Sequence, residues 1–322
     1  MVTTTSPQPD VALTGGRRRG PDRLFRGLAV SASGIVVALV VIVGAFLVTK
    51  AAPSLAADTA SFLGSREWNV SDPTHLRFGI AQLLWVTVIS SILAMALAVP
   101  VAIGVALYLT HYAPARVAKP FAYLVDLLAA VPSIVFGLWG ARVLMAYVQP
   151  LQDFLKGILG WLPLFAPTSV QAGTIFLASI VLAIMILPII TALSREVFRQ
   201  TPNEHKEAAL ALGATRWEMI RIAVLPFGRP GVISAAMLGL GRALGETIAV
   251  TIILSTTSGA FSWSLFFGGE TFASKIANAA SEFDAPSKTG AYIAAGLVLF
   301  LLTFAVNAVA RIIIERRKAF TE

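Results

Sequence analysis

The stretch TPNEHKEAALALGATRWEMIRIAVLP, residues 201–226, separates two long apolar runs and predicts a hairpin of two short helices. In its first half, Thr201 can act as an N-cap, Pro202 follows at the first helical position, and Glu204 completes a capping box. The alanines and leucines that come next are strong helix formers. Gly213 is then expected to end the first helix in the left-handed conformation that glycine adopts without strain.

The second half of the stretch predicts a second short helix. Thr215 can cap this helix, with Glu218 three residues further on, and apolar residues then recur at helical spacing. Pro226 and Pro230 are expected to end it. A short, well-capped hairpin suits docking into the groove of another protein, but an ordinary connector between two helices fits the same pattern.

On both sides of this hairpin the sequence is apolar and almost uncharged. A helix that spans a membrane needs about twenty apolar residues at a rise of about 1.5 Å each. Six segments meet this requirement, namely Leu28–Val48, Ile80–Leu109, Phe121–Val148, Val170–Leu193, Gly231–Leu254 and Ala291–Ile314. The first follows a basic stretch, as in a signal peptide, but its apolar run exceeds the roughly 7–15 residues of a signal core. We therefore expect a retained helix.

The composition indicates an integral membrane protein. Of the 322 residues, 57% are hydrophobic and 13% are charged, whereas a soluble domain carries about 25% charged residues. The formal net charge of +8 is explained by basic residues that flank membrane helices, which leaves no soluble basic face for nucleic acid. The chain has no cysteine, so disulfides, thiolate metal sites and a cysteine nucleophile are excluded.

The distribution of lysine and arginine predicts the orientation of the helices. Seventeen of the 25 basic residues fall in the two terminal segments and in the loops on their side, against six in the other loops. The positive-inside rule then puts both termini and the hairpin in the cytoplasm. The expected fold is all-α: a six-helix membrane domain over residues 27–316, with a cytoplasmic loop at 194–229. Residues 1–26 read as a disordered basic tail and residues 317–322 as a C-terminal tail.

Two charged residues interrupt the fifth apolar segment, in LGLGRALGET at residues 238–247. A charge inside a membrane helix costs about 2.5–3.5 kcal/mol on insertion scales, so a functional role is the default interpretation. Arg242 and Glu246 are four residues apart and are expected to lie on one helix face, where they can pair. Two interpretations stay open: an ion pair that holds the bundle together, or an anion path in which Glu246 competes for the guanidinium and keeps binding weak.

Neighbouring residues extend this candidate path. Thr247 and Thr251 lie nearby at helical spacing, and Gly239, Gly241 and Gly245 are expected to let another backbone approach closely.

A third buried-charge candidate and the absence of catalytic motifs complete the inventory of sites. Arg142, in the third segment, belongs to the candidate path, although it can also reach the outer headgroups. The sequence contains neither a P-loop nor an HExxH motif, so we expect that this chain does not itself hold ATP phosphates and is not an enzyme.

Three motifs resemble those of ABC importer permeases. The EAA loop of that family is matched by Glu207, Ala208, Ala209, Gly213, Leu225 and Pro226. The loop departs from the family pattern at Ala223, where an isoleucine is usual. AAVPSIVFGLWG at 129–140 and GRALGETIAV at 241–250 are similar to the permeases of the phosphate importer, of the PstC type. The resemblance extends over roughly residues 28–315.

The resemblance implies the type I importer fold and a permease subunit, multi-pass in a bacterial plasma membrane, that moves inorganic phosphate inward. It implies a sister permease of the PstA type, a dimer of ABC ATPases of the PstB type and an external phosphate-binding protein of the PstS type. The ATPases would bind ATP and couple to the EAA loop, so this chain itself is expected to hold no cofactor. In phosphate permeases the positions of Arg242 and Glu246 are regarded as critical for transport.

Two alternatives remain. The first is an ABC permease for another oxyanion or small solute, which the EAA loop alone does not exclude. The second belongs to a different class, an ion channel or secondary transporter without an ATPase, and the EAA loop argues against it.

Overall fold

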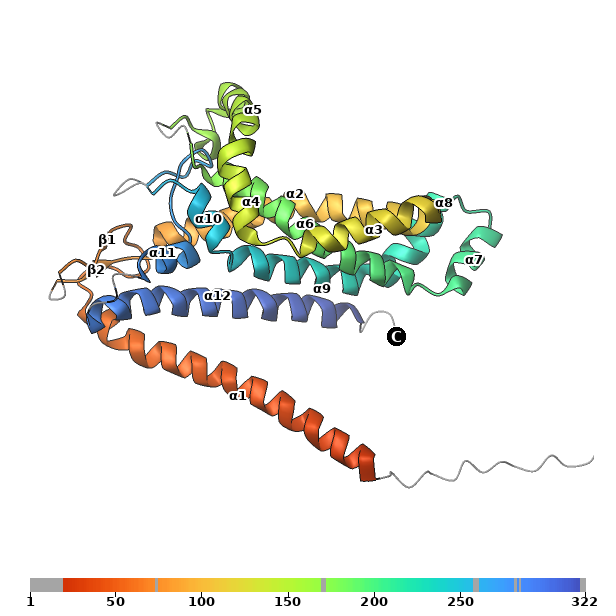
Figure 1. Ribbon diagram of the computed structural model, residues 1–322, viewed down its shortest axis with the longest axis horizontal. Helices are drawn as coiled ribbons and strands as arrows, with labels where there is room; N and C mark the ends of the chain where they lie inside the picture. Colours follow the sequence, from red (N-terminus) through yellow and green to blue (C-terminus); the bar gives the residue numbers. More distant parts are fainter. Residues whose placement is uncertain are drawn as a thin grey trace, which may run out of the picture. The chain divides into compact units, whose positions relative to one another are not determined.

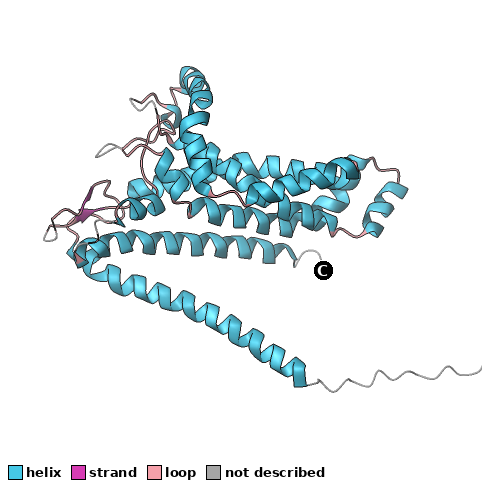
Figure 2. Cartoon of the chain, in the orientation of Figure 1, coloured by secondary structure: helices cyan, strands magenta, loops and turns pink. Residues whose placement is uncertain are grey.

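Helices make up most of the described chain, with one two-stranded hairpin (Figures 1 and 2). This computed structural model describes residues 20–72, 75–168, 172–256, 261–280, 283 and 285–318. The chain divides into two compact units, Met1–Phe46 and Leu47–Glu322. The elements are α1 Gly20–Ala57, β1 Trp68–Asn69, β2 Arg77–Phe78, α2 Ala81–Leu107, η1 Tyr108–Tyr112, α3 Ala115–Ala129, α4 Ser133–Trp139, η2 Gly140–Leu144, α5 Met145–Leu159, η3 Pro163–Phe165, α6 Ile175–Arg199, α7 Asn203–Ala211, α8 Arg216–Met219, η4 Ile220–Val224, α9 Leu225–Leu244, α10 Ile248–Ile253, α11 Phe272–Asn278 and α12 Pro286–Lys318.

Within these described residues, six helical stretches are long and apolar enough to cross a membrane. They are Leu24–Ala57, Ala81–Tyr112, Ser133–Leu159, Ile175–Arg199, Arg216–Leu244 and Pro286–Ile312. The all-α class and the number of spans are therefore confirmed. The cytoplasmic location of the termini stays a prediction.

The first helix begins before the predicted boundary of the N-terminal tail. Helix α1 starts at Gly20, so residues 20–26 are helical, although we expected them to be disordered. Pro21 suits the first turn of a helix, where its missing N–H costs no hydrogen bond. The rest of the expected tails, residues 1–19 and 319–322, lies outside the described residues.

The third span is displaced from its predicted position, Phe121–Val148. Helix α3 ends at Ala129, residues 130–132 are not helical, and α4 begins at Ser133. Pro132 explains this break, because a proline disfavours the helical conformation in the residue before it. The span runs instead through α4, the π-turn η2 and α5, and α3 is left as a separate helix that packs on α6.

The fifth span begins and ends earlier than the predicted Gly231–Leu254. One continuous helical stretch runs from Arg216 to Leu244, so Pro226 does not end the second short helix. The π-turn η4 shifts the hydrogen-bond register directly before this proline. Pro226 is the second residue of α9, so its missing N–H falls where the π-turn changes the hydrogen-bond register, and the helix continues.

Helix α6 forms the centre of the second unit, between α2 and α9 (Figure 1). Most of its residues are buried and apolar around the whole circumference, as expected for a helix inside a bundle. Helix α2 presents Ala94, Ala98, Ala102 and Ala106, which recur every four residues and are at most 1% exposed. Small residues at this spacing let two membrane helices pack closely. The α2–α6 pair is therefore the tightly packed core of the bundle.

An ion pair joins α3 to α6 on the flank of this core. The Nη2 atom of Arg195 lies 3.3 Å from Oδ2 of Asp126, and the arginine side chain is only 15% exposed. The Nε and Nη1 atoms of Arg195 are buried and have no hydrogen-bond partner. Asp126 is thus the main described partner of a cation that is largely withdrawn from solvent.

Replacing Asp126 by alanine is expected to lower the free energy of unfolding by about 1–3 kcal/mol, because it leaves the buried guanidinium without its acceptor. Thermal unfolding of the purified transporter in detergent would measure the effect. Asp153→Ala is the control, since Asp153 pairs with Lys156 but its side chain is 62% exposed, and exposed pairs contribute about 0–1 kcal/mol. Equal losses in both variants would contradict a special role for the Arg195–Asp126 pair.

Candidate functional site

The stretch with the two membrane charges does not form a continuous helix. Helix α9 ends at Leu244, residues 245–247 are not helical, and α10 begins at Ile248. The Oε1 atom of Glu246 accepts a hydrogen bond of 3.1 Å from the backbone N–H of Ala249. The first N–H groups of a helix lack partners within it, so this carboxylate stabilises a new helix start. Glu246 is itself 8% exposed.

Arg242 and Glu246 therefore do not pair as we predicted. Their i, i+4 spacing brings side chains together only while the helix continues, and here it breaks at Gly245. No hydrogen bond or ion pair of Arg242 with any described residue is present, and the residue is half-buried. Arg242 thus presents a guanidinium that the described residues do not satisfy, four residues before a carboxylate with one oxygen bonded to a backbone N–H.

The three glycines around Arg242 have different surroundings. A Cβ atom added at Gly239 would lie 2.8 Å from Cδ1 of Ile190, so this glycine does allow close packing of α9 on α6. Gly241 has no heavy atom within 4 Å of such a Cβ, and Gly245 has only a carbonyl of its own helix end. The face with Gly241 and Gly245 is exposed in the single chain.

The two membrane motifs, 129–140 and 241–250, lie against each other although they are more than a hundred residues apart. A Cβ at Gly137 in α4 would lie 2.8 Å from Cα of Ala249 in α10. One at Gly140 would lie 2.6 Å from Cγ2 of Val181 in α6. Only glycine fits so close to a neighbouring backbone, so α4 and α10 form one packed unit beside Glu246.

Gly137→Ala is expected to lower the free energy of unfolding by about 1–3 kcal/mol, because the new methyl group meets backbone atoms of Ala249 that cannot move independently. The control is Gly104→Ala in α2. Nothing lies within 4 Å of a Cβ there, and alanine gains up to about 1 kcal/mol over glycine in a helix. Thermal unfolding that ranks the two variants in the opposite order would contradict the close contact between α4 and α10.

The remaining predicted path residues occupy different environments. The Oγ1 atom of Thr247 donates to the carbonyl of Gly245 at 3.2 Å, inside the break. The Oγ1 atom of Thr251 is buried without a hydrogen-bond partner. Arg142 lies in the π-turn η2 and is exposed, and among the described residues no hydrogen bond or ion pair joins it to Glu246. The structure thus brings the two threonines close to the break and shows no bond from Arg142 to Glu246.

The turn of the hairpin at 201–226 and the start of its second helix form as predicted, whereas the helix continues past both Pro226 and Pro230. Gly213 has φ +85°, the left-handed conformation that separates the two helices. Thr215 and Glu218 form the complete capping box at the start of α8. The first capping box is wrong, because α7 begins at Asn203 and Thr201 instead continues the end of α6, donating its N–H to Phe198.

The hairpin has one face on the bundle and one face open. Ala209 is buried in a cluster with Phe198 and Ile220, which fixes α7 against the ends of α2 and α6. Glu207 and Ala208 are exposed, and so are the large apolar side chains of Leu210, Leu212 and Trp217. Leu212 is 88% exposed, an unusual position for a leucine in a well-ordered turn. Such an apolar surface is typical of a docking site for another protein.

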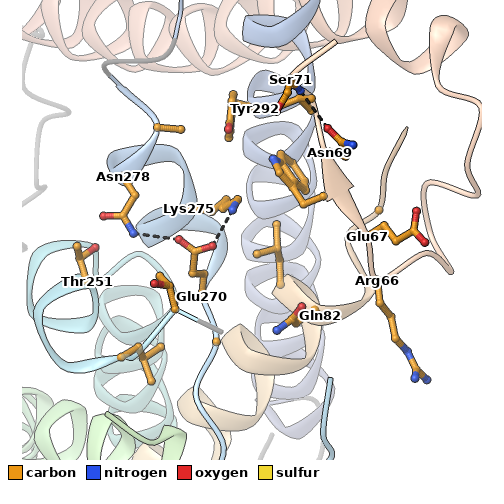
Figure 3. Close-up of a pocket in the computed structure, with 18 residues that line it drawn as sticks. Arg66, Glu67, Asn69, Ser71, Gln82, Thr251, Glu270, Lys275, Asn278 and Tyr292 are labelled. Atoms are coloured by element: carbon orange, nitrogen blue, oxygen red, sulfur yellow. Dashed lines mark hydrogen bonds and ion pairs between the residues drawn. The ribbon is translucent and has the colours of Figure 1, made fainter. Parts of the chain in front are cut away.

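Sequence reasoning missed a polar cavity of about 890 Å³ at the end of the second unit away from the hairpin (Figures 1 and 3). Its walls come from the β1–β2 hairpin and from parts of α2, α10, α11 and α12. Thr251 lines the cavity together with Glu270 and Lys275, which form an ion pair of 2.7 Å. The two charges are five residues apart across the start of α11, a spacing that helical periodicity does not reveal.

The chain is similar to known transport proteins. Residues 98–319 match the family described as "Binding-protein-dependent transport system inner membrane component". The chain is 55% identical over 318 residues to "Phosphate transport system permease protein PstC 2" of Mycobacterium tuberculosis, covering 97% of this chain and 98% of that protein. It is 58% identical over 295 residues to "Phosphate transport system permease protein PstC" of Mycobacterium leprae, covering 91% and 92%.

Two solved structures are similar in fold at 16% sequence identity. The inward-facing MetNI methionine ABC transporter has a TM-score of 0.54, over 74% of this chain and 95% of that chain. A bacterial ABC transporter involved in the import of the acidic polysaccharide alginate has a TM-score of 0.52, over 76% and 80%. The helical bundle therefore has the fold of an ABC importer permease.

Proposed function

We propose a path for inorganic phosphate from one premise: the chain belongs to the binding-protein-dependent transport system inner membrane components, as a phosphate ABC transporter permease of the PstC type. As a permease subunit of a bacterial ABC importer it crosses the cell membrane several times and does not itself hydrolyse ATP. Its partners are a sister permease, ATPase subunits and a binding protein. We assign these partners to the PstA, PstB and PstS types respectively.

The observation that carries the path is the unsatisfied guanidinium of Arg242. Guanidinium matches the geometry of phosphate oxygens and binds them with two parallel hydrogen bonds. A side chain that has no hydrogen-bond or ion-pair partner among the described residues, beside a helix break in a membrane protein, is available to a passing anion. Glu246 stays close by in sequence but is held by the N–H of Ala249. It therefore repels a bound anion and keeps binding weak, as transport requires.

The second part of the proposal concerns coupling. The ATPase would bind the exposed face of the hairpin. Leu210, Leu212 and Trp217 would lie in an apolar groove of the ATPase, with Glu207 at the rim of that groove. The continuous helix from Arg216 to Leu244 then connects this surface directly to Arg242. A movement of the hairpin that follows ATP binding would thus reach the path through a single rigid element.

Reconstitution of all four kinds of subunit in liposomes tests the function. We expect radioactive phosphate to accumulate only when ATP is supplied on the ATPase side, and an excess of sulfate not to compete. Accumulation of another oxyanion in place of phosphate would favour a different substrate. Phosphate flux without ATP would instead favour a channel or a secondary transporter.

A further inference from the structure

The cavity opposite the hairpin holds a lysine and a glutamate that the path described so far does not use. Nζ of Lys275 lies 2.7 Å from Oε2 of Glu270, and Nδ2 of Asn278 donates to Oε1 at 2.9 Å (Figure 3). The side chains of Lys275 and Glu270 are 21% and 15% exposed. Lys275 also lies 5.6 Å from the ring centroid of Trp68. Both carboxylate oxygens are therefore occupied, while the ammonium has three donors and uses one of them in this contact.

The backbone around this ion pair is fixed by several independent contacts. Thr271 and Ser274 form a capping box at the start of α11, and the N–H of Phe272 donates to Oγ1 of Thr87 in α2 at 3.1 Å. The N–H of Gly269 donates to the carbonyl of Ser255 at 3.0 Å, with φ +146° at the glycine. The pair is thus held in place from α2 and from the end of α10, as expected of a preorganised site.

The same cavity reaches the element that carries the path. Thr251 and Leu254, at the end of α10, line its wall, and α10 begins two residues after Glu246. The cavity wall and the helix break therefore lie at opposite ends of the short helix α10. The lining also contains the amides of Asn69 and Asn278 and the hydroxyl of Thr256, all of which can donate hydrogen bonds to an anion.

We propose that Lys275 is a second anion-binding site on the phosphate path, which we call the anion station. Glu270 is the group that competes with the anion for the ammonium of Lys275. The ligand is a small divalent oxyanion, since Lys binds phosphate as a point charge and the cavity supplies neutral donors around it. A cation is disfavoured because both oxygens of Glu270 already accept hydrogen bonds. An anion alone can use both Lys275 and Arg242. The inference rests on the proposed function and adds a binding station to it.

Chemical modification of lysine tests the station directly. The intact transporter is treated with an amine-acylating reagent, without binding protein, and the rate at each lysine is followed by mass spectrometry. We expect inorganic phosphate to slow the modification of Lys275, and chloride at the same ionic strength to leave it unchanged. Lys156 is a matched internal control, because it pairs with Asp153, is equally exposed at 21%, and lies 5.4 Å from an aromatic ring centroid. Lys156 does not line the cavity.

Two neutral variants then separate an anion station from a structural ion pair. Glu270→Gln removes the competing charge, so the phosphate concentration that gives half protection should fall about tenfold. Lys275→Gln should lower ATP-driven phosphate uptake about tenfold, while Lys156→Gln leaves it unchanged. The swapped variant Lys275→Glu with Glu270→Lys restores the pair but moves the cation, so it should not restore uptake.

Three results would overturn the station. They are full uptake in the swapped variant, equal protection of Lys275 and Lys156, and no protection of Lys275 in a transporter that does carry phosphate. The last result leaves the proposed function intact, since wild-type uptake is measured in the same preparation. Absence of phosphate uptake by the wild-type transporter would instead contradict the function itself.

Discussion

Arg242→Ala is expected to reduce ATP-driven phosphate uptake about a hundredfold or more, because it removes two charge-assisted hydrogen bonds to the anion. The substitution should leave folding intact. Arg242 has no described partner that would be left unsatisfied, and Glu246 keeps its bond to the N–H of Ala249. Uptake in reconstituted liposomes measures the loss, and co-purification of the subunits checks assembly.

Two further variants refine this expectation. Arg242→Lys keeps the charge but loses the planar fork, so an intermediate loss of about tenfold is expected. Glu246→Gln keeps an acceptor for the N–H of Ala249 and removes the charge, so it should strengthen phosphate binding and slow its release. Intact phosphate uptake in Arg242→Ala, with loss of uptake of a different solute, would show that phosphate is not the substrate.

Gly213→Pro is expected to abolish phosphate uptake while the chain still inserts in the membrane. Gly213 has φ +85°, whereas proline fixes φ near −65°, so the turn between α7 and α8 cannot form. A cost of about 3 kcal/mol corresponds to a factor of about a hundred in the fraction of correctly folded hairpins. Gly213→Asn is the control, because asparagine tolerates the left-handed conformation. The ratio of transported phosphate to hydrolysed ATP measures the coupling.

A charge reversal on the same hairpin tests whether its exposed surface is needed for coupling, without changing its fold. Glu207 is exposed in α7, so Glu207→Lys should leave the hairpin folded and still reduce coupled uptake. Insertion can be checked with single cysteines, since the chain contains none. Normal ATP-driven uptake in both Gly213→Pro and Glu207→Lys would contradict the assignment of the hairpin as the coupling surface.

The spans were predictable because their apolar runs are long, whereas their ends depend on single residues. Pro132 breaks the third apolar segment into two helices. A single proline among apolar residues changes the mean hydropathy of the segment very little, so hydropathy does not reveal the break. Pro226 has the opposite outcome, because the π-turn η4 before it allows the helix to continue. Hydropathy measures burial in lipid and carries no information on such local changes in hydrogen bonding.

The candidate site was predictable in its residues but not in its contacts. Arg242 and Glu246 stand out because charge is costly in an apolar segment, and this needs no knowledge of the fold. Their predicted pairing assumed a continuous helix and failed where Glu246 caps a new one. The contact between Gly137 and Ala249 and the pair of Lys275 with Glu270 come from tertiary packing and from a loop, respectively. Neither has a periodic signature in the sequence.

The four buried alanines of α2, Ala94, Ala98, Ala102 and Ala106, have a consequence for the transport cycle. Helices that touch through residues as small as Ala94 and Ala102 have no side-chain layer that could shear, so α2 and α6 are expected to travel as one rigid body. Alternating access must then be accommodated at the interruptions of the helices, residues 130–132 and 245–247. These two interruptions border the packed α4–α10 unit, so the part of the chain expected to change orientation is the part beside the proposed phosphate path.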